Sequence, residues 1–320
     1  MTASWQPGAS LATLAARARL LAQVRAFMAE HGVLEVDTPI LARTSVTDPA
    51  IESIRTTCGH ALQPSPEYFM KRLLAAGSGP IFQLGHVFRA GEQGRWHNPE
   101  FLMLEWYRTD CDDAALMDEL DALGARLLPG FPAGRIGHDQ LLSDYLGIDF
   151  RHADAERLAT ALTARSGREL HTAPADPAAT GAAPGWLLDL AYAEACAELR
   201  GAWFVTDFPP AQAALARLRT DARGERVAAR FELIVDGVEL ANGYHELTDA
   251  AEQRARFEQD QALRRARGQI VPAADEQLLA ALEAGLPDCA GVAVGLDRVL
   301  MLQLGLPHLD AAMPFSAPRV

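Results

Sequence analysis

The spacing of hydrophobic residues predicts an amphipathic helix over residues 11–30. Apolar side chains recur there at steps of three and four residues, which places them on one helical face. Gly32 ends the pattern, since glycine commonly follows the last helical residue. The residues on the predicted apolar face are Leu14, Ala18, Leu21, Val24 and Met28. Further helices are expected over 109–128, 250–267 and 275–284.

Two helix starts carry recognisable end signals. Ser65 is expected to be the N-cap of a helix that has Pro66 in its first turn and Glu67 near its positive end. Asp249 and Glu252 have the spacing of a capping box in front of the helix over 250–267. From spacing alone, the segment at Ser65 needs no role beyond starting a helix.

Shorter apolar runs predict strands, and most of these come in hairpin-like pairs. Residues Ile81–Arg89 and Phe101–Arg108 flank a polar loop, and Phe231–His245 contains a second pair around a turn. Residues Gly291–Gly295 are expected to form a buried strand that runs straight into a helix, and a further strand is expected over 33–40. Paired strands with helices beside them indicate an antiparallel β-sheet flanked by helices, which is an α+β fold.

Composition indicates a globular protein with a substantial core, because 49% of the residues are apolar and 22% are charged. The 320 residues suit a single catalytic domain over 1–320 with a variable insertion at about 109–225. Within that insertion, the Ala-, Pro- and Gly-rich stretch 166–186 predicts a flexible connection. No apolar stretch approaches the roughly 20 residues of a membrane span, and the N-terminus lacks a signal-peptide pattern. We therefore expect a cytoplasmic protein without membrane contact.

Charge and cysteine usage narrow the possible partners. Lys plus Arg number 29 and Asp plus Glu number 42, which gives a formal net charge of −13. Such an acidic surface is a poor platform for phosphate backbones and lowers the expectation of nucleic-acid partners. Four cysteines lie far apart, without the spacing of a zinc site or a disulfide framework, so we expect reduced thiols at Cys58, Cys111, Cys196 and Cys289.

The predicted hairpin over 231–245 places two carboxylates near each other. Asp236-Gly237 is a strong two-residue turn signal. The resulting register pairs Val235 with Val238, Ile234 with Glu239, Leu233 with Leu240, and Glu232 with Ala241. Leu233, Val235, Val238 and Leu240 then share a core face, while Glu232 and Glu239 are diagonal neighbours on the other face. That second face is either a cation site or a solvated surface.

The predicted strand over 101–108 has two different faces. Leu102, Leu104 and Trp106 form a core face, while the opposite face carries Phe101, Met103, Glu105 and Tyr107. An aromatic ring, a carboxylate and a phenol in a row suit a ligand cleft, although each one alone could be an ordinary surface or half-buried residue. Arg89 ends the preceding strand, where a guanidinium could bind a phosphate.

Arg298 has an unusual position for a cation. It falls in the first turn of the predicted helix Leu296–Leu304, next to the positive end of the helix dipole. Asp297 could offset the unfavourable charge, but a bound polyanion would make the arginine and the helix end favourable together.

Three segments together resemble the motifs of class II aminoacyl-tRNA synthetases. Residues 33–39 (VLEVDTP) resemble motif 1, Phe88-Arg89 with 97–101 (HNPEF) resembles motif 2, and 291–298 (GVAVGLDR) resembles motif 3. The stretches SPEYFMKRLL, HNPEFLMLEWYR and ELANGYHELTD are similar to the lysyl branch. The resemblance runs over nearly the whole chain and is weakest at 109–225.

Within that branch, the chain most resembles the free-standing paralogues that attach (R)-β-lysine to elongation factor P. The helix before motif 1 begins near residue 9, which leaves no room for an N-terminal anticodon-binding domain. The opening TASWQP is similar to these paralogues. Ala293 stands where lysyl-tRNA synthetases have glycine, and its methyl group would narrow the amino-acid pocket.

The resemblance implies a homodimer formed through motif 1, with ATP and Mg²⁺ as cofactors. It implies that Arg89 holds the α-phosphate, that Arg298 holds the γ-phosphate and that Phe101 stacks on adenine. The full implied ATP site is Arg89, Ala90, Gly91, Glu92, Asn98, Phe101, Glu239, Leu240, Gly295 and Arg298, with Glu232 and Glu239 as the metal ligands. The implied amino-acid pocket is Ser65, Pro66, Glu67, Glu105, Tyr107, Asn242, Glu246 and Ala293. Glu246 has the wrong strand parity relative to Glu239, so we expect a β-bulge at Asn242-Gly243.

Motif 2 departs from the family pattern. Class II synthetases usually have Arg-x-Glu, and the glutamate helps to read the adenine edge. Here the segment reads Arg89-Ala90-Gly91-Glu92. Either Glu92 takes over that role after a one-residue shift or backbone groups do so.

The implied activity is ATP-dependent activation of (R)-β-lysine as an adenylate, followed by transfer to the ε-amine of a lysine on elongation factor P. One alternative is a truncated synthetase that charges tRNA, which the acidic composition disfavours. Another is a non-catalytic regulatory subunit, which would be expected to have lost its phosphate-binding arginines or metal-binding acids. Arg89, Arg298, Glu232 and Glu239 are all present.

Overall fold

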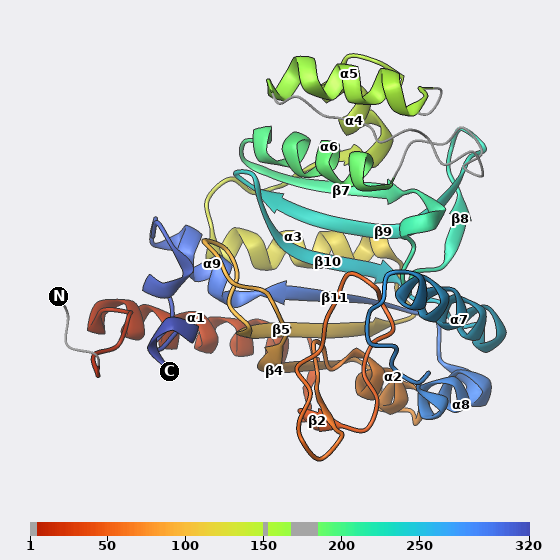
Figure 1. Cartoon of the computed structure of the whole chain (residues 1–320). Helices are drawn as coiled ribbons and strands as arrows, with labels where there is room; N and C mark the ends of the chain where they lie inside the picture. The colour runs from red at the N-terminus through yellow and green to blue at the C-terminus, as the bar shows by residue number, and fades with distance from the viewer. Residues whose placement is uncertain (1–4, 150–152, 168–184) are drawn as a thin grey trace.

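The computed structural model describes residues 5–149, 153–167 and 185–320 (Figure 1). The helices are α1 (Leu11–Glu30), α2 (Glu67–Ala75), α3 (Asp113–Leu127), α4 (His138–Leu146), α5 (Ala155–Ser166), α6 (Gly185–Glu198), α7 (Ala250–Ala266), α8 (Glu276–Gly285) and α9 (Leu296–Gln303). The strands are β1 (Leu34–Glu35), β2 (Leu41–Ala42), β3 (Ala61–Leu62), β4 (Ile81–Phe88), β5 (Glu100–Thr109), β6 (Gly134–Gly137), β7 (Ala202–Phe208), β8 (Leu218–Thr220), β9 (Arg226–Val235), β10 (Val238–His245) and β11 (Cys289–Gly295). Most of the predicted connection over 166–186 lies outside the described residues.

One mixed sheet runs through the molecule in the order β1-β4-β5-β11-β10-β9-β7-β6, and β8 pairs with β9. Its central pairs are antiparallel, as expected, while β1 pairs with β4 and β6 pairs with β7 in parallel. β11, close to the end of the chain, lies between β5 and β10 (Figure 1). The α+β prediction is therefore confirmed, although the sheet is not purely antiparallel.

The two faces of the sheet are covered by different helices. Leu104, Trp106, Leu233 and Val292 point into a core that also contains buried residues of α1, α3 and α9. The opposite face is covered at one end by α4, α5 and α6 and at the other by α2, α7 and α8. Between these two groups of helices, the middle of the sheet remains open on that face.

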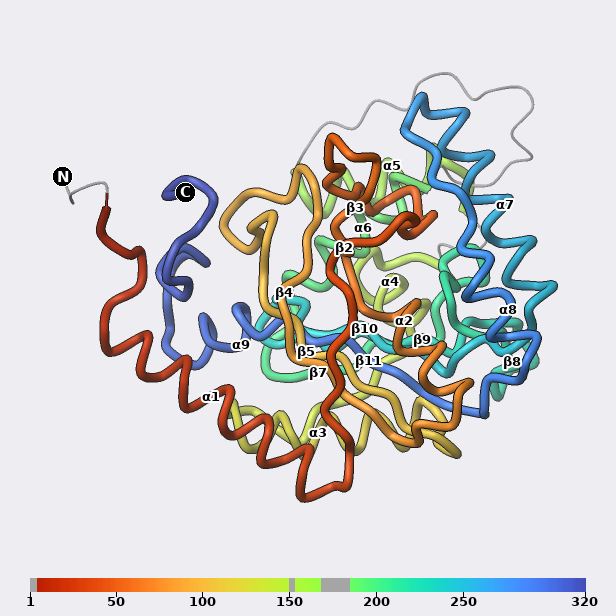
Figure 2. The backbone as a smooth tube through the Cα atoms, turned by 90° about the horizontal axis from the view of Figure 1, so that it is seen from below, coloured from red at the N-terminus to blue at the C-terminus, as the bar shows by residue number. Residues whose placement is uncertain are grey.

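The N-terminal helix has the predicted bounds, but only part of the predicted apolar face is buried. Val24 and Met28 are buried as predicted, whereas Leu14 and Leu21 are half-buried and Ala18 is exposed. The other buried apolar residues of the helix are Ala16, Leu20 and Phe27. Alanines and leucines occur all round this helix, so periodicity alone did not single out a face. Residues just before α1 bond to the C-terminal segment, with Ala9 N donating to Met313 O at 3.0 Å, and Figure 2 shows the two segments side by side.

The predicted strand over 33–40 is almost entirely irregular. Only Leu34 and Glu35 pair with β4, and Val36 N adds one further bond to Phe82 O. Pro39 has no N–H to donate to a sheet, and the chain leaves the sheet before reaching it. Helix α2 begins at Glu67, with Pro66, whose backbone angles are helical, at the assigned N-cap position, and the Ser65 side chain makes the predicted capping bond by accepting from Glu67 N.

The β9–β10 hairpin contains the expected bulge, but two residues earlier than predicted. Val238 pairs with Val235 and Glu239 with Ile234, as predicted, and the register then shifts so that Ala241 faces Leu233. Leu240 and Ala241 are both buried in the core beneath the sheet. A bulge here buries two consecutive apolar side chains and leaves the polar residues on either side facing the open face.

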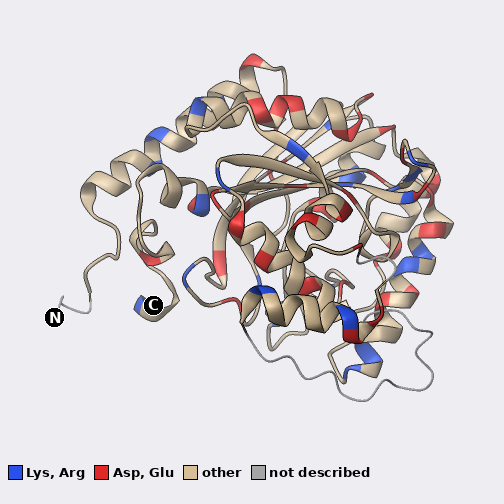
Figure 3. Cartoon of the chain, turned by 90° about the horizontal axis from the view of Figure 1, so that it is seen from above, with Lys and Arg blue, Asp and Glu red and all other residues tan. Residues whose placement is uncertain are grey.

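Charges of both signs occur on the same elements (Figure 3). On α7, for example, Arg256 pairs with Glu252, and Arg254 pairs with Glu276 of α8 at 2.7 Å. One half of the predicted capping box of α7 is confirmed, because the Asp249 side chain accepts a bond from Glu252 N, whereas the Glu252 carboxylate accepts from Arg256. No described helix has the length and apolar character needed to cross a membrane.

Candidate active site

A cleft of about 670 Å³ lies on the open face of the sheet. Its floor comes from β5, β11, β10 and β9, and its walls include residues of α2, α6 and α7. The predicted site residues that line it are Ser65, Glu67, Arg89, Glu92, Asn98, Phe101, Glu105, Tyr107, Glu232, Glu239, Leu240, Asn242, Glu246, Ala293, Gly295 and Arg298. Of the predicted residues, Pro66, Ala90 and Gly91 lie outside this wall. The structure therefore brings together residues that are more than 200 positions apart in the sequence.

Two arginines and an aromatic ring form one end of the cleft. The Arg89 guanidinium lies 5.2 Å from the centre of the Phe101 ring, and its Nη1 is 3.6 Å from Glu92. Arg89 Nε is buried and has no hydrogen-bond partner among the described residues. An unpaired buried donor of a cation is a favourable place for an anion.

Arg298 is held in the cleft by two backbone carbonyls. Its Nε donates to Trp96 O at 3.0 Å and its Nη1 donates to Glu239 O at 2.8 Å. These bonds also give Arg298 a structural role, because they connect α9 to the motif 2 loop and to β10. Asp297 does not neutralise Arg298; it is buried against Arg17 of α1 and accepts a bond from Leu102 N at 2.7 Å.

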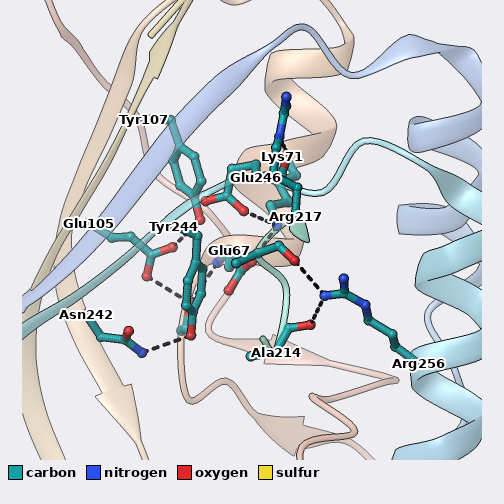
Figure 4. A network of polar contacts seen from close by, with 12 residues as sticks. Glu67, Lys71, Glu105, Tyr107, Ala214, Arg217, Asn242, Tyr244, Glu246 and Arg256 are labelled. Carbon is teal, nitrogen blue, oxygen red and sulfur yellow. Dashed lines mark hydrogen bonds and ion pairs between the residues drawn. The ribbon is translucent and has the colours of Figure 1, made fainter. Parts of the chain in front are cut away.

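The other end of the cleft contains a cluster of buried carboxylates (Figure 4). Glu105 accepts bonds from Tyr107 at 2.7 Å and from Ser65 at 2.8 Å. Burial, together with the nearby charge of Glu67, raises the pKa of Glu105 to about 7. Ser65 also accepts a bond from Glu67 N, so this serine caps the start of α2, as predicted, and also connects it to the cluster.

Lys71 is a buried member of the cluster that the sequence reasoning missed. Its Nζ lies 2.6 Å from Glu67 and 2.7 Å from Glu246 (Figure 4). Burial opposes its positive charge, but Glu246 and Glu67 outweigh that effect and raise the pKa of Lys71 above its usual value. Burial raises the pKa of Glu246 as well, to about 8. The spacing of Glu67 and Lys71, four residues apart on one helix, was the available signal.

The floor between the two ends is formed by β11. Ala293 lies between Glu105 of β5 and Asn242 of β10 in the sheet register. At Gly291, a Cβ atom would come within 2.2 Å of the Tyr107 ring and 2.6 Å of a Glu246 oxygen. Small residues on this strand therefore set the depth of the carboxylate end of the cleft.

Glu232 and Glu239 both face the cleft from the hairpin. Glu232 receives bonds from Arg230 and from the Tyr192 hydroxyl of α6, the latter at 2.6 Å. Burial raises the pKa of Glu232, with Arg230 opposing the shift and Glu239 adding to it. The Glu239 side chain is 48% exposed and lies 3.7 Å from Arg298. Within the described residues, no group of three or more His, Cys, Asp or Glu side chains could hold a metal ion.

Arg230 and Tyr192 are further cleft residues that the sequence reasoning missed. Arg230 is half-buried, and its guanidinium also lies 4.3 Å from the centre of the Phe208 ring. Tyr192 comes from a helix within the variable insertion, where no motif pointed to it. The strand parity of Arg230, two residues before Glu232, was the one usable signal for the arginine.

The match of the whole chain to a family agrees with this geometry. Residues 6–319 match the family of class II tRNA synthetases (D, K and N), and the chain belongs to this family. Three relatives carry the name elongation factor P–(R)-β-lysine ligase, in Salmonella dublin, Salmonella paratyphi B and Salmonella heidelberg. Each is 44% identical to this chain over 99% of both sequences. The class II fold and the resemblance to these ligases are therefore confirmed.

Proposed function

We propose that this protein is an AMP-forming ligase that activates (R)-β-lysine with ATP and transfers it to the ε-amine of a lysine on elongation factor P. The observation that carries the proposal is the carboxylate cluster. Glu67 and Glu246 both contact one resident cation, Lys71, and Glu105 adds a third carboxyl group to the cluster. The cluster has more carboxyl groups than cations, so in its ionised form it attracts a substrate with two ammonium groups. Full-length identity of 44% to relatives named as such ligases supports the same substrate.

The arginine end of the cleft suits ATP. In the first step, a carboxylate oxygen of the amino acid attacks the α-phosphorus of ATP, and the bond to pyrophosphate breaks. Arg89 and Arg298 would position the phosphates and offset their charge, and Phe101 would stack on adenine. In the second step, the acceptor amine attacks the carbonyl carbon of the mixed anhydride, AMP leaves, and the amine loses a proton.

Glu232 and Glu239 are the proposed ligands for Mg²⁺. Both are carboxylates that face the same cleft, and the pKa of Glu232 responds to the charge of Glu239. A carboxylate has about four lone-pair positions, so the bonds from Arg230 and Tyr192 leave Glu232 able to bind a cation. A bound Mg²⁺ would offset charge on the departing pyrophosphate.

We further propose a homodimer and a location in the cytoplasm, where an elongation factor works. Leu34, Ile40 and Leu41 are 58%, 45% and 45% exposed in and beside motif 1. The family resemblance assigns the dimer contact to this segment. Such large exposed apolar side chains are common in an interface between subunits.

The proposed function is tested by ATP–pyrophosphate exchange with (R)-β-lysine and with lysine, followed by transfer to purified elongation factor P or to tRNA. We expect exchange with (R)-β-lysine and labelled elongation factor P, with no charged tRNA. Labelled tRNA would instead identify a synthetase, and no exchange with either amino acid would indicate a non-catalytic subunit.

Arg298→Ala is expected to abolish exchange while the protein remains folded, because the arginine contacts ATP. The loss of its two hydrogen bonds should cost only about 1–3 kcal/mol of stability. Arg95→Ala is the matched control, since Arg95 bonds to Pro307 O and lies outside the cleft wall. Full exchange activity of Arg298→Ala, or its unfolding, would contradict the assignment.

A further inference from the structure

A chain of hydrogen bonds runs from the metal end of the cleft to the amino-acid end. Arg230 bonds to Glu232 and donates from Nε to Asn242 Oδ1 at 3.2 Å. Asn242 Nδ2 then donates to the Tyr244 hydroxyl at 2.8 Å (Figure 4). Asn242 and Tyr244 lie two residues apart on β10, beyond the bulge, so both face the cleft.

The direction of this chain is fixed by chemistry. An arginine has only donors, so the carbonyl oxygen of Asn242 must face Arg230 and its amide NH₂ must face Tyr244. The Tyr244 oxygen thus accepts a bond, and burial raises the pKa of Tyr244 so that the hydroxyl keeps its proton. Among the described residues, Tyr244 has no acceptor for that proton.

The chain also polarises its last member. Each donor in the series is strengthened by the bond that its own group accepts, and the series begins at a half-buried cation, Arg230. The Tyr244 hydroxyl is therefore a strengthened donor that faces a cleft, and its best partner is an anion. The two amines of the proposed substrate are donors when charged, which leaves its carboxylate as the matching group.

We infer that Tyr244 is a substrate-binding residue whose hydroxyl donates to the carboxylate of the amino acid, and that Asn242 and Arg230 are positioning residues. This assignment rests on the proposed function. It reassigns Asn242, because both ends of its amide are already bonded within the protein. The same chain of hydrogen bonds connects Glu232 with the reacting carboxylate of the amino acid, since Arg230 contacts both Glu232 and Asn242.

The test compares two ligands that differ only in the carboxylate. (R)-β-lysine and 1,4-diaminopentane have the same two amines on the same carbon spacing, and calorimetry without ATP measures both dissociation constants. Tyr244→Phe is expected to raise the dissociation constant of (R)-β-lysine about 10-fold or more, as for a lost hydrogen bond to a charged group. The dissociation constant of 1,4-diaminopentane should change less than about twofold. Equal weakening of the two ligands, or no change in either, would overturn the inference.

A double-mutant cycle separates the roles of Tyr244 and Asn242. Asn242→Ala is expected to weaken the binding of (R)-β-lysine when Tyr244 is present. It should have no further effect on binding in Tyr244→Phe, because Asn242 acts through the Tyr244 hydroxyl. Additive effects would show that Asn242 binds the substrate directly and would overturn its positioning role. If the natural protein binds neither (R)-β-lysine nor lysine, the proposed function fails and this assignment fails with it. Binding by the natural protein together with an unaffected Tyr244→Phe variant overturns the assignment alone.

Discussion

Ala293 occupies the middle of the cleft floor, directly between a carboxylate of β5 and an amide of β10. Its methyl group takes space that the backbone of an α-amino acid would need, whereas a β-amino acid carries its amine one carbon further along. A difference of this size in a packed pocket corresponds to about 10–200-fold in discrimination. Ala293→Gly should therefore improve kcat/KM for lysine relative to (R)-β-lysine by about that factor, measured by pyrophosphate exchange.

Ala290→Gly is the control for this prediction. Ala290 lies on the same strand but is fully buried on the opposite face, so the change removes a methyl group without opening the cleft. We expect it to lower stability and to leave the ratio of the two substrates unchanged. An unchanged ratio in Ala293→Gly would show that another residue selects the substrate.

Glu105 should make substrate binding depend on pH. Burial raises its pKa to about 7, so the carboxyl is largely protonated below that pH and cannot pair with an ammonium group. The affinity for (R)-β-lysine should therefore rise as the pH increases from 6 to 8, and calorimetry in buffers of different ionisation enthalpy should detect proton release. In Glu105→Gln, the step near pH 7 should disappear, while a step near pH 8 from Glu246 should remain. A flat profile in the natural protein would show that Glu105 is ionised throughout this range.

At the scale of elements, the bulge in β10 lets one hairpin serve both ends of the cleft. It turns Glu239 and Asn242 to the same face although three positions separate them. For Glu239→Gln, we expect the Mg²⁺ concentration for half-maximal exchange to rise about 10-fold or activity to be lost, because one charged ligand is removed. Glu232→Gln should have the same effect and should also weaken the amino acid, since it releases Arg230.

Glu225→Gln is the control for the metal prediction, because Glu225 is an exposed residue just before β9 and lies outside the cleft wall. Titration of pyrophosphate exchange with MgCl₂ measures all three variants. If both cleft variants keep the natural magnesium dependence, the two glutamates are not the metal ligands.

Elements with strong local signals could be predicted from the sequence. The alternation in β5, the turn at Asp236-Gly237 and the N-cap at Asp249 each depend on residues close together in the chain, and all three are confirmed. The buried face of α1 depends on which tertiary partner it meets, and its many alanines and leucines fit several faces. The bulge position depends on packing beneath the sheet, which overrides the simple alternation.

In the candidate site too, some residues could be predicted from the sequence and others could not. Residues within motifs could be placed by resemblance, and most of them line the cleft. Lys71, Arg230 and Tyr192 were missed because their importance comes from partners distant in the sequence, such as Glu246 for Lys71 and Glu232 for Tyr192. The role of a buried charged residue depends on its partner, and a sequence pattern around that one residue does not identify the partner.

At the scale of the whole molecule, the exposed apolar residues of motif 1 should control assembly. Leu41→Arg places a charge in the proposed subunit contact, and we expect sedimentation to show a monomer at micromolar concentration. Trp186→Arg is the control, because Trp186 is 48% exposed on α6 and lies outside motif 1. A dimeric Leu41→Arg protein would place the contact elsewhere.

The position of β11 has a consequence for how the protein is made. β5 and β10 cannot reach their final places until β11 inserts between them, and β11 ends at residue 295. Until β11 has been made, the facing edges of β5 and β10 lack their common partner, although β4 can already pair with β1 and β9 with β7. The central sheet therefore closes only at a late stage of synthesis. Such long-range pairing is slow, and the two unpaired strand edges are open to aggregation during that time.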